Sequence, residues 1–447
     1  MSYQNYTQNP KTYNDQASDM TGVPSSYSSN SDIRMLPSTT TIKTVPSTSG
    51  TQNQNGMLLF QIPASSGAGY LRSSSMYLQL DVTVVSVAAA ASFWCFNNGT
   101  TTGAPVGASV QPGGASAIIN RINVSVGGTL ISSINNYDKL ASLIYNHACS
   151  ESYTRNDAAI YEGYGQCYLA TGAGGDAGRE LTRQFQIPLL SSCFNSESIP
   201  LFLLNSPIVV EILLNGLGAI AGSAGAGVVT AWNVSNCNLV YETCNFDSSY
   251  ENEMKKKLMD GALYKISTSE FYNLQISEAT AINYNLGLSL SSVKSCFFTS
   301  QPTYVADQIQ GFNGPAAISK IQLFIDSRLI NNNSMTSYSA QYMELQRALG
   351  GMFDYSTSSN NGSRIPVVGD HQRTSATNFG NYNGGNYFGG VSCQRSSDGG
   401  YIMSGTPCMT LQFSRQATAV TAGVFYIMIA YSQILLIDSS GSVSLVR

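Results

Sequence analysis

One stretch of this chain occurs twice, and the duplication constrains the fold more than any other feature. Residues 118–131 read IINRINVSVGGTLI and residues 317–330 read AISKIQLFIDSRLI, with a constant offset of 199 residues and no gap. Apolar residues alternate in both copies, which predicts a strand with one buried face and one solvated face. The equivalent apolar positions include Val124 and Leu323, and Val126 and Ile325.

Both copies continue into a turn and then into a helix. Gly127-Gly128 and Asp326-Ser327 supply turn residues before a Leu-Ile return strand, so each copy predicts a β-hairpin. Beyond it, after six extra residues in the second copy, Tyr137, Leu140 and Ile144 fall on Tyr342, Leu345 and Leu349 at helical spacing. A period near 200 residues is that of a domain and too long for a solenoid. Chance similarity between two hairpins is the alternative.

Composition favours close packing against other proteins. Charged residues make up 11% of the 447 residues, less than half the usual share, while apolar residues make up 43%. A surface with so few charges repels neighbouring subunits weakly, although a secreted adhesin has a similar composition. The net charge is −4 and the chain has no basic excess, which argues against sequence-specific nucleic-acid binding.

The cysteines and the apolar segments bear on the compartment. Nine cysteines, an odd number without C-x-x-C spacing, predict free thiols in a reducing environment. No apolar run follows basic residues at the N-terminus, so we expect no signal peptide. Residues 416–437 carry no charge and have the length of a membrane anchor. Thr421, Gly423, Ser432 and Gln433 divide them, which favours two buried strands instead.

The chain divides into four segments by composition. Residues 1–56 are polar with balanced charges and predict a flexible N-terminal arm. A first domain follows over 57–248 and a second over 263–447. Residues 249–262 between them predict a solvated linker helix, with Glu251 paired to Lys255 and Glu253 paired to Lys257.

The two domains repeat one order of strands. We expect residues 283–290 to be equivalent to 77–84, and the strand after Pro407 to that after Pro207. Residues 424–431 then match 239–244, and long loops span 88–115, 146–180 and 354–406. Each domain holds about eight short strands with Gly- and Pro-rich turns, which indicates a sandwich. The sequence therefore predicts an all-β chain of two tandem eight-stranded jelly rolls with short helices in the loops.

No catalytic, cofactor-binding or metal-binding residues are predicted, and we expect no enzyme and no cofactor. His147 lies two residues from Cys149, a spacing that does not bring side chains together on a helix, and His371 stands apart. Gly216 to Ala221 matches the dinucleotide fingerprint G-x-G-x-x-A, with Glu242 about 20 residues on. Further glycines follow where a helix would have to begin, which favours a loop.

One run of residues resembles a known family. Arg183 to Leu189 contains Ile-Pro-Leu, Pro200-Leu201-Phe202 follows, and Ser206 to Ile212 is an alternating strand ending in Glu-Ile. This run is similar to the end of the first roll in double jelly-roll major capsid proteins of tailless icosahedral DNA viruses. That lineage includes adenovirus hexon and the capsid proteins of membrane-containing phages, virophages and polinton-like viruses. The motif covers about 30 residues, and the architecture covers 57–447.

The resemblance implies a structural protein of the virion, assembled inside the host cell. Three chains would form a pseudo-hexameric capsomer of six rolls, and the capsomers would tile an icosahedral shell. Partners would be neighbouring capsomers, penton and minor capsid proteins through the N-terminal arm, and an internal membrane where the virus has one. The alternatives are a capsid protein with separate single rolls, a secreted two-domain β-sandwich adhesin or carbohydrate-binding protein, and a glycan-active enzyme, which would need a convergent carboxylate pair.

Overall fold

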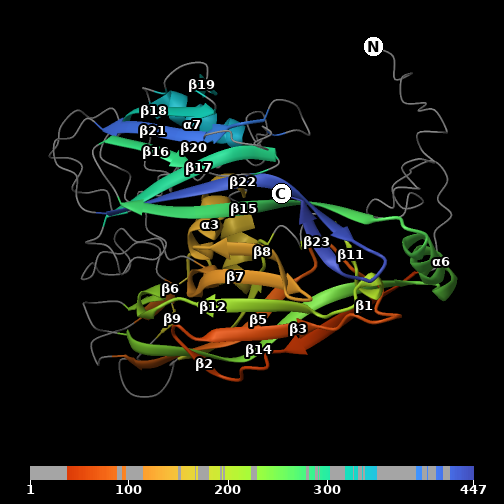
Figure 1. Cartoon of the computed structure of the whole chain (residues 1–447). Coiled ribbons are helices and arrows are strands. Elements are labelled where there is room, and N and C mark those ends of the chain that lie inside the picture. The colour runs from red at the N-terminus through yellow and green to blue at the C-terminus, as the bar shows by residue number, and fades with distance from the viewer. Residues whose placement is uncertain are drawn as a thin grey trace, which may run out of the picture.

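Two β-sandwiches stacked one on the other make up the chain (Figure 1). The computed structural model describes residues 38–87, 93–96, 114–149, 153–166, 168–169, 181–191, 194, 197–222, 229–277, 281–286, 290, 292–302, 318–325, 327–330, 335, 338–349, 389–394, 400, 409–415 and 423–446.

Eight strands form the first roll. They are β1 (Ser38–Pro46), β3 (Met57–Ile62), β5 (Tyr77–Val87), β7 (Ile119–Val126), β8 (Thr129–Asn135), β10 (Thr182–Pro188), β12 (Ile208–Leu214) and β14 (Val229–Phe246). One sheet has the order β3-β12-β7-β8. In the other, β14 pairs with β1 along one edge and with β5 along the other, and β10 pairs with β5. All these pairs are antiparallel.

The next eight strands form the second roll in the same pattern. They are β15 (Tyr264–Ser277), β16 (Ala281–Leu286), β17 (Ser292–Pro302), β18 (Ile318–Ile325), β19 (Arg328–Leu329), β20 (Gly389–Ser392), β21 (Met409–Arg415) and β22 (Gly423–Ile437). The sheets have the orders β16-β21-β18-β19 and β15-β22-β17-β20. Taken in chain order, each strand holds the sheet position of its counterpart in the first roll, so the chain is two tandem eight-stranded jelly rolls.

Shorter elements connect these strands. The added strands are β2 (Gln52–Asn53), β4 (Tyr70–Leu71), β6 (Phe93–Phe96), β9 (Tyr168–Leu169), β11 (Ile199–Pro200), β13 (Ile220–Gly222) and β23 (Val443–Val446). The helices are α3 (Tyr137–Leu143), α4 (Ala158–Tyr161), α6 (Ser248–Met259) and α7 (Tyr338–Ala348). Single turns of 3-10 or π-helix lie at η2 (Ala115–Ile118), η3 (Ile144–Ala148), η4 (Tyr153–Asp157), η5 (Leu201–Leu203) and η6 (Leu217–Ala219).

The duplicated hairpin has the same register in both rolls. Val126 lies opposite Thr129, and Ile325 opposite Arg328, so each turn has two residues. Gly127 and Gly128 have φ values of 55° and 84°, which glycine adopts without steric cost. Val124 pairs with β12 as Leu323 pairs with β21, and both side chains are fully buried. Helices α3 and α7 follow the two hairpins. These features confirm the duplication predicted from the sequence.

The predicted boundary of the N-terminal arm is wrong. Residues 38–46 form β1, the edge strand of the first roll, which pairs with β14 over its whole length. The strand is polar and mostly exposed, with Ile42 66% exposed, so main-chain hydrogen bonds hold it and it has no apolar period to reveal it. Residues 47–56 of the predicted arm contain β2, which also pairs with β14. Residues 1–37 lie outside the described residues.

One predicted strand equivalence is also wrong. Strand β16 holds the position of β3, and β17, not β16, holds the position of β5 in the sheet. Strands β5 and β16 both alternate apolar and polar residues, which is the basis of the predicted equivalence, but alternation does not determine which strand each one pairs with. The predicted equivalences of β12 with β21 and of β14 with β22 are confirmed by the sheet order.

A strand interrupts the predicted loop 354–406. Strand β20 reads Gly-Gly-Val-Ser, is buried throughout and pairs with β17. A Cβ on Gly389 would overlap the ring of Phe298, and one on Gly390 would lie 2.9 Å from Leu345 Cδ1. Glycine therefore allows β20 to lie at the edge of this sheet in close contact with Phe298 and with α7. The other two predicted loops, 88–115 and 146–180, fall partly outside the described residues. Their described parts contain β6, η4, α4 and β9.

The linker helix forms as α6, but it is not fully solvated. Glu253 and Lys257 form the predicted pair at 3.4 Å. Glu251 is buried and accepts a hydrogen bond from the Gly67 amide at 3.1 Å, while Lys255 donates to Ser66 Oγ at 2.8 Å. The helix is therefore docked on the loop before β4 through two of the residues predicted to pair with each other.

Candidate functional site

The contact between the two rolls joins distant parts of the chain. Strand β8 and helix α3 of the first roll lie directly beneath β15 and β22 of the second (Figure 1). One hydrophobic core runs across this boundary, because side chains of the second roll such as Phe297, Tyr426 and Met428 belong to the same buried cluster as the first-roll core. The second roll also has a separate interior core.

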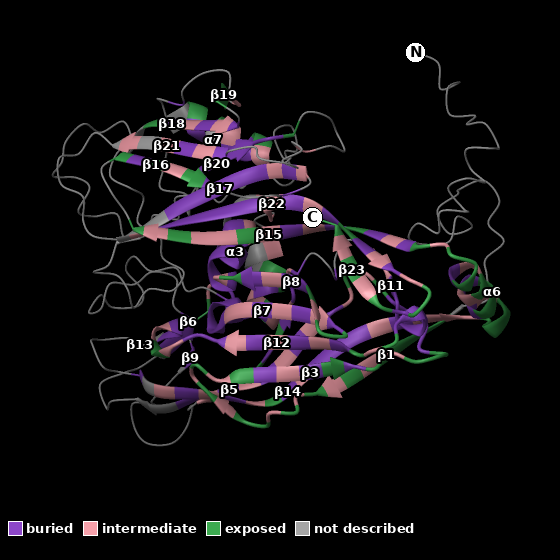
Figure 2. Ribbon diagram, in the orientation of Figure 1, coloured by how far each residue is buried: buried purple, intermediate pink, exposed green. Residues whose placement is uncertain are grey.

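Strand β22 shows how the boundary is built. Residues 425–429 are all buried, which appears as the long purple arrow in Figure 2. Phe425, Ile427 and Ile429 face the interior of the second roll, while Tyr426 and Met428 pack with the first-roll core. This run lies in the segment that has the length of a membrane anchor, but its apolar residues cover two protein cores on the two faces of one strand. No helix among the described residues is long and apolar enough to cross a bilayer.

Amide side chains of the second roll bind main-chain and amide oxygens of the first. Gln433 Nε2 donates to the Ile131 carbonyl at 2.8 Å, and Asn273 Nδ2 donates to the Asn135 carbonyl. Gln275 Nε2 donates to Asn136 Oδ1 at 2.5 Å. Gln433 is fully buried. These bonds fix the position of one roll on the other along β8 and at the residue before α3.

A buried ion pair lies in α3 at this boundary. Lys139 Nζ is 2.8 Å from Asp138 Oδ2, and the two side chains are 5% and 4% exposed. Lys139 also lies over the ring of Tyr426 in the second roll, 5.8 Å from its centre. Burial raises the pKa of Asp138 and lowers that of Lys139, while their mutual attraction opposes both changes. The charge of each side chain therefore depends on the other.

A second buried carboxyl lies at the end of α4. Glu162 is 0% exposed and accepts a hydrogen bond from the Tyr145 hydroxyl. Burial raises its pKa to about 8, and hydrogen bonds from Tyr145 and the Ser116 main chain offset part of that effect. Tyr145 in turn stacks on Tyr153 at 6.2 Å and packs on Tyr164 at 5.5 Å. The sequence did not predict this buried carboxyl, because a single glutamate near tyrosines is also typical of an exposed segment.

The residues considered from the sequence do not converge on a reaction centre. Gly216 to Ala221 forms η6 and enters β13, so no helix begins where a dinucleotide would need one. His147 lies in η3, and His371 lies outside the described residues. Within the described ranges, no three His, Cys, Asp or Glu side chains gather as metal ligands. Six cysteines of that part are free: Cys95, Cys149, Cys237, Cys244, Cys296 and Cys393.

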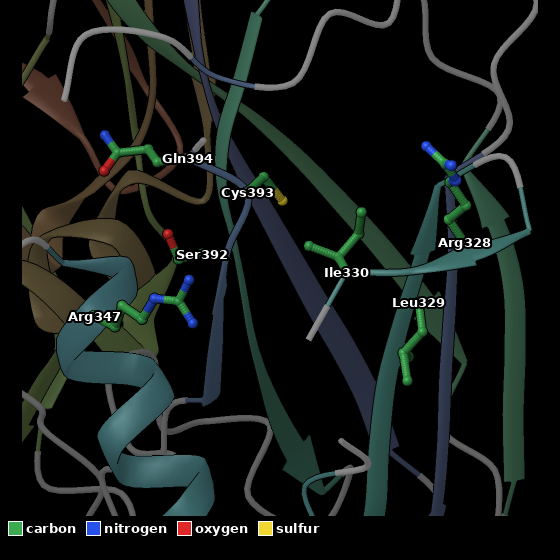
Figure 3. Close-up of a pocket in the computed structure, with 7 residues that line it drawn as sticks. All are labelled: Arg328, Leu329, Ile330, Arg347, Ser392, Cys393 and Gln394. Carbon is green, nitrogen blue, oxygen red and sulfur yellow. The ribbon is translucent and has the colours of Figure 1, made fainter. Parts of the chain in front are cut away.

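A cleft of about 480 Å³ lies at the outer end of the second roll. It separates the hairpin strand β19 from helix α7 and strand β20. Arg347 and Arg328 stand at opposite sides of it, with Cys393 and Ile330 between them (Figure 3). Arg347 is paired with Glu344 at 3.3 Å. The lining residues are Arg328, Leu329, Ile330, Arg347, Ser392, Cys393 and Gln394.

The fold is shared with solved viral capsid proteins. The Faustovirus major capsid protein aligns at a TM-score of 0.57 and 8% identity, over 91% of this chain and 92% of that chain. The PBCV-1 virus capsid aligns at 0.56 and 12% identity, over 94% and 99%. The mavirus major capsid protein aligns at 0.50 and 11% identity, over 100% and 96%. No protein-family model and no curated protein matches the sequence. The chain therefore has the double jelly-roll fold of these viral capsid proteins, as its sequence predicted.

Proposed function

We propose that this chain is a major capsid protein, a structural component of a virion shell. The observation that carries the proposal is the joining of two rolls of identical strand order by one continuous hydrophobic core. A protein that tiles a surface needs a fixed angle between its parts, and a shared core supplies that rigidity. The common fold with viral capsid proteins supports the same function.

The oligomer in this proposal is a homotrimer that forms a pseudo-hexameric capsomer. Three chains with two similar rolls each give six rolls around a local three-fold axis, and closed rings are the usual outcome of such symmetric contacts. A charged share of 11% keeps repulsion between the packed subunits small. Neighbouring capsomers would then complete the icosahedral shell, which assembles inside the host cell.

Native mass spectrometry tests this proposal. The expected species has a mass near three times 47.7 kDa and persists on dilution, because obligate interfaces bury on the order of 2,000 Å² or more. Electron microscopy of the concentrated protein should show hexagonal blocks or shells. A stable monomer that binds glycans would contradict the proposal and favour the adhesin alternative.

We propose that residues 1–37 form the arm that contacts penton and minor capsid proteins, and an internal membrane where one is present. Support comes from their composition, which is polar, with Lys11 and Arg34 against Asp15, Asp19 and Asp32 as the charged residues. A chain beginning at residue 38 keeps β1 intact, so it should still form trimers. It should assemble fewer shells than the full chain in a particle-yield assay. Equal yields from the two chains would reduce the segment to a passive terminus.

The domain division that we propose follows the sheets. The first roll begins at β1 and ends with β14, α6 links the rolls, and the second roll runs from β15 to β23. Neither roll has a proposed catalytic, cofactor-binding or metal-binding residue. A purified trimer that cleaves or modifies glycans, proteins or nucleotides would contradict this non-enzymatic assignment.

A further inference from the structure

The boundary inside the chain joins a defined pair of edges. Strand β8 ends the sheet β3-β12-β7-β8 of the first roll, and β15 begins the sheet β15-β22-β17-β20 of the second. These two edge strands lie next to each other, with β15 above β8 (Figure 1). The contact is head-to-tail, because it joins two non-equivalent edges, the β8 edge of the first roll and the β15 edge of the second.

Among the described residues, each chain therefore has one further edge of each kind with no partner roll: the β1 edge of the first roll and the β19 edge of the second. Strand β1 holds in the first roll the sheet position that β15 holds in the second, and it pairs with β14 alone among the described strands. Strand β19 holds the position of β8, and among the described strands it pairs with β18 alone. A second copy of the chain could repeat the internal contact by placing its β1 against β19.

Burial of one pair of equivalent residues, Ile131 and Ile330, differs as this repetition requires. Ile131 follows Leu130 in β8, is 2% exposed, and its carbonyl accepts a hydrogen bond from Gln433 of the other roll. Ile330 is its counterpart at the offset of 199 residues, and it is only half-buried, where it lines the cleft in Figure 3. The cleft thus lies where the first roll has its neighbour.

The surface of β1 matches the cleft in polarity. Ile42 is 66% exposed on an otherwise polar strand and lies directly opposite Glu242 of β14, so both side chains are on one face. Glu242 carries a carboxylate that is 30% exposed and bonded to Arg72. The cleft carries the complementary pair, apolar Leu329 beside the exposed Arg328. The apolar and the charged side chains of β1 and β14 therefore each have a matching side chain in the cleft.

We propose that the cleft of β19 and α7 is the docking site for β1 of a second copy of this chain. Ile42 packs on Leu329 and Ile330, and Glu242 lies against Arg328. The inference rests on the proposed trimer and names the residues of its subunit contact. Three such contacts, each a repeat of the contact between β8 and β15, would close the ring.

Cysteine cross-linking tests the adjacency directly. The double variant Ile42→Cys and Leu329→Cys should form covalent trimers on mild oxidation, because a disulfide requires Cα atoms within about 7 Å. Each single variant is a matched control and should remain uncross-linked, since the cysteines described in the native chain are buried or half-buried. Migration on a non-reducing gel reads the result.

Charge reversal tests the polar half of the contact. Arg328→Glu and Glu242→Arg should each raise the concentration at which trimers dissociate by roughly tenfold or more. The two together should restore it, because the opposite charges again face each other. Arg72→Ala controls for the loss of the bond within the chain.

The outcomes separate this inference from the proposed function. Trimers that form normally, do not cross-link through Ile42→Cys and Leu329→Cys, and ignore both charge reversals would overturn the docking site and leave the capsid function standing. A wild-type chain that stays monomeric at all concentrations would overturn both. Cross-linked trimers with rescue by the double reversal are the result we expect.

Discussion

Replacing Glu162 with glutamine should remove a pH dependence from the stability of the first roll. The carboxyl is fully buried, and its pKa in the folded chain is about 8 instead of the ordinary 4.5. Between these two pH values the folded state holds a proton that the unfolded state has lost. The free energy of unfolding therefore falls as pH rises through this window, and the loss is complete above about pH 8.

The magnitude follows from the two pKa values. Each pH unit within the window corresponds to about 1.4 kcal/mol, so moving from 4.5 to about 8 costs at most about 5 kcal/mol. Between pH 5 and pH 8 the expected loss is about 4 kcal/mol. Glutamine is neutral throughout, and its side-chain oxygen can still accept the hydrogen bond from Tyr145. The free energy of unfolding of the variant should therefore increase relative to that of the wild type as pH rises.

Urea unfolding followed by circular dichroism at pH 5, 6.5 and 8 measures this difference. The midpoints of wild type and Glu162→Gln should converge at pH 5 and separate at pH 8, with the variant the more stable. Glu253→Gln is the matched control, because that side chain is 66% exposed on α6 and its profile should follow the wild type. Parallel profiles for wild type and Glu162→Gln would refute the reasoning.

Two further substitutions address helix α3. Lys139→Met should destabilise the chain by about 3–5 kcal/mol, because it leaves the Asp138 carboxylate buried without its cation, and Asp138→Asn added to it should recover most of the loss in urea unfolding. Tyr137→Phe should cost about 1–3 kcal/mol, since the hydroxyl accepts from the Leu190 amide at 2.9 Å and donates to the Pro188 carbonyl at 3.2 Å. An unchanged midpoint in either variant would contradict the assigned contacts.

Local chemistry made much of the fold predictable. The duplicated hairpin needs alternating apolar residues and a two-residue turn, and both are properties of adjacent positions, so residues 118–131 and 317–330 could be assigned before the structure. The start of strand β12 directly after Pro207 could also be predicted, because it depends on a residue adjacent in sequence. A repeat at domain spacing then determined the number of rolls, because two similar sequences bury similar faces.

Other features could be assigned only with the tertiary structure, because they depend on which segment covers which. Strand β1 lacks an apolar period and is held by β14, about 200 residues away in sequence. Strand β20 reads as a glycine-rich loop until Phe298 and α7 press against it. Glu162 differs from an exposed glutamate only in what surrounds it. Hydrophobic periodicity predicts that one face of an element is buried. Which segment covers that face depends on the packing of the whole chain.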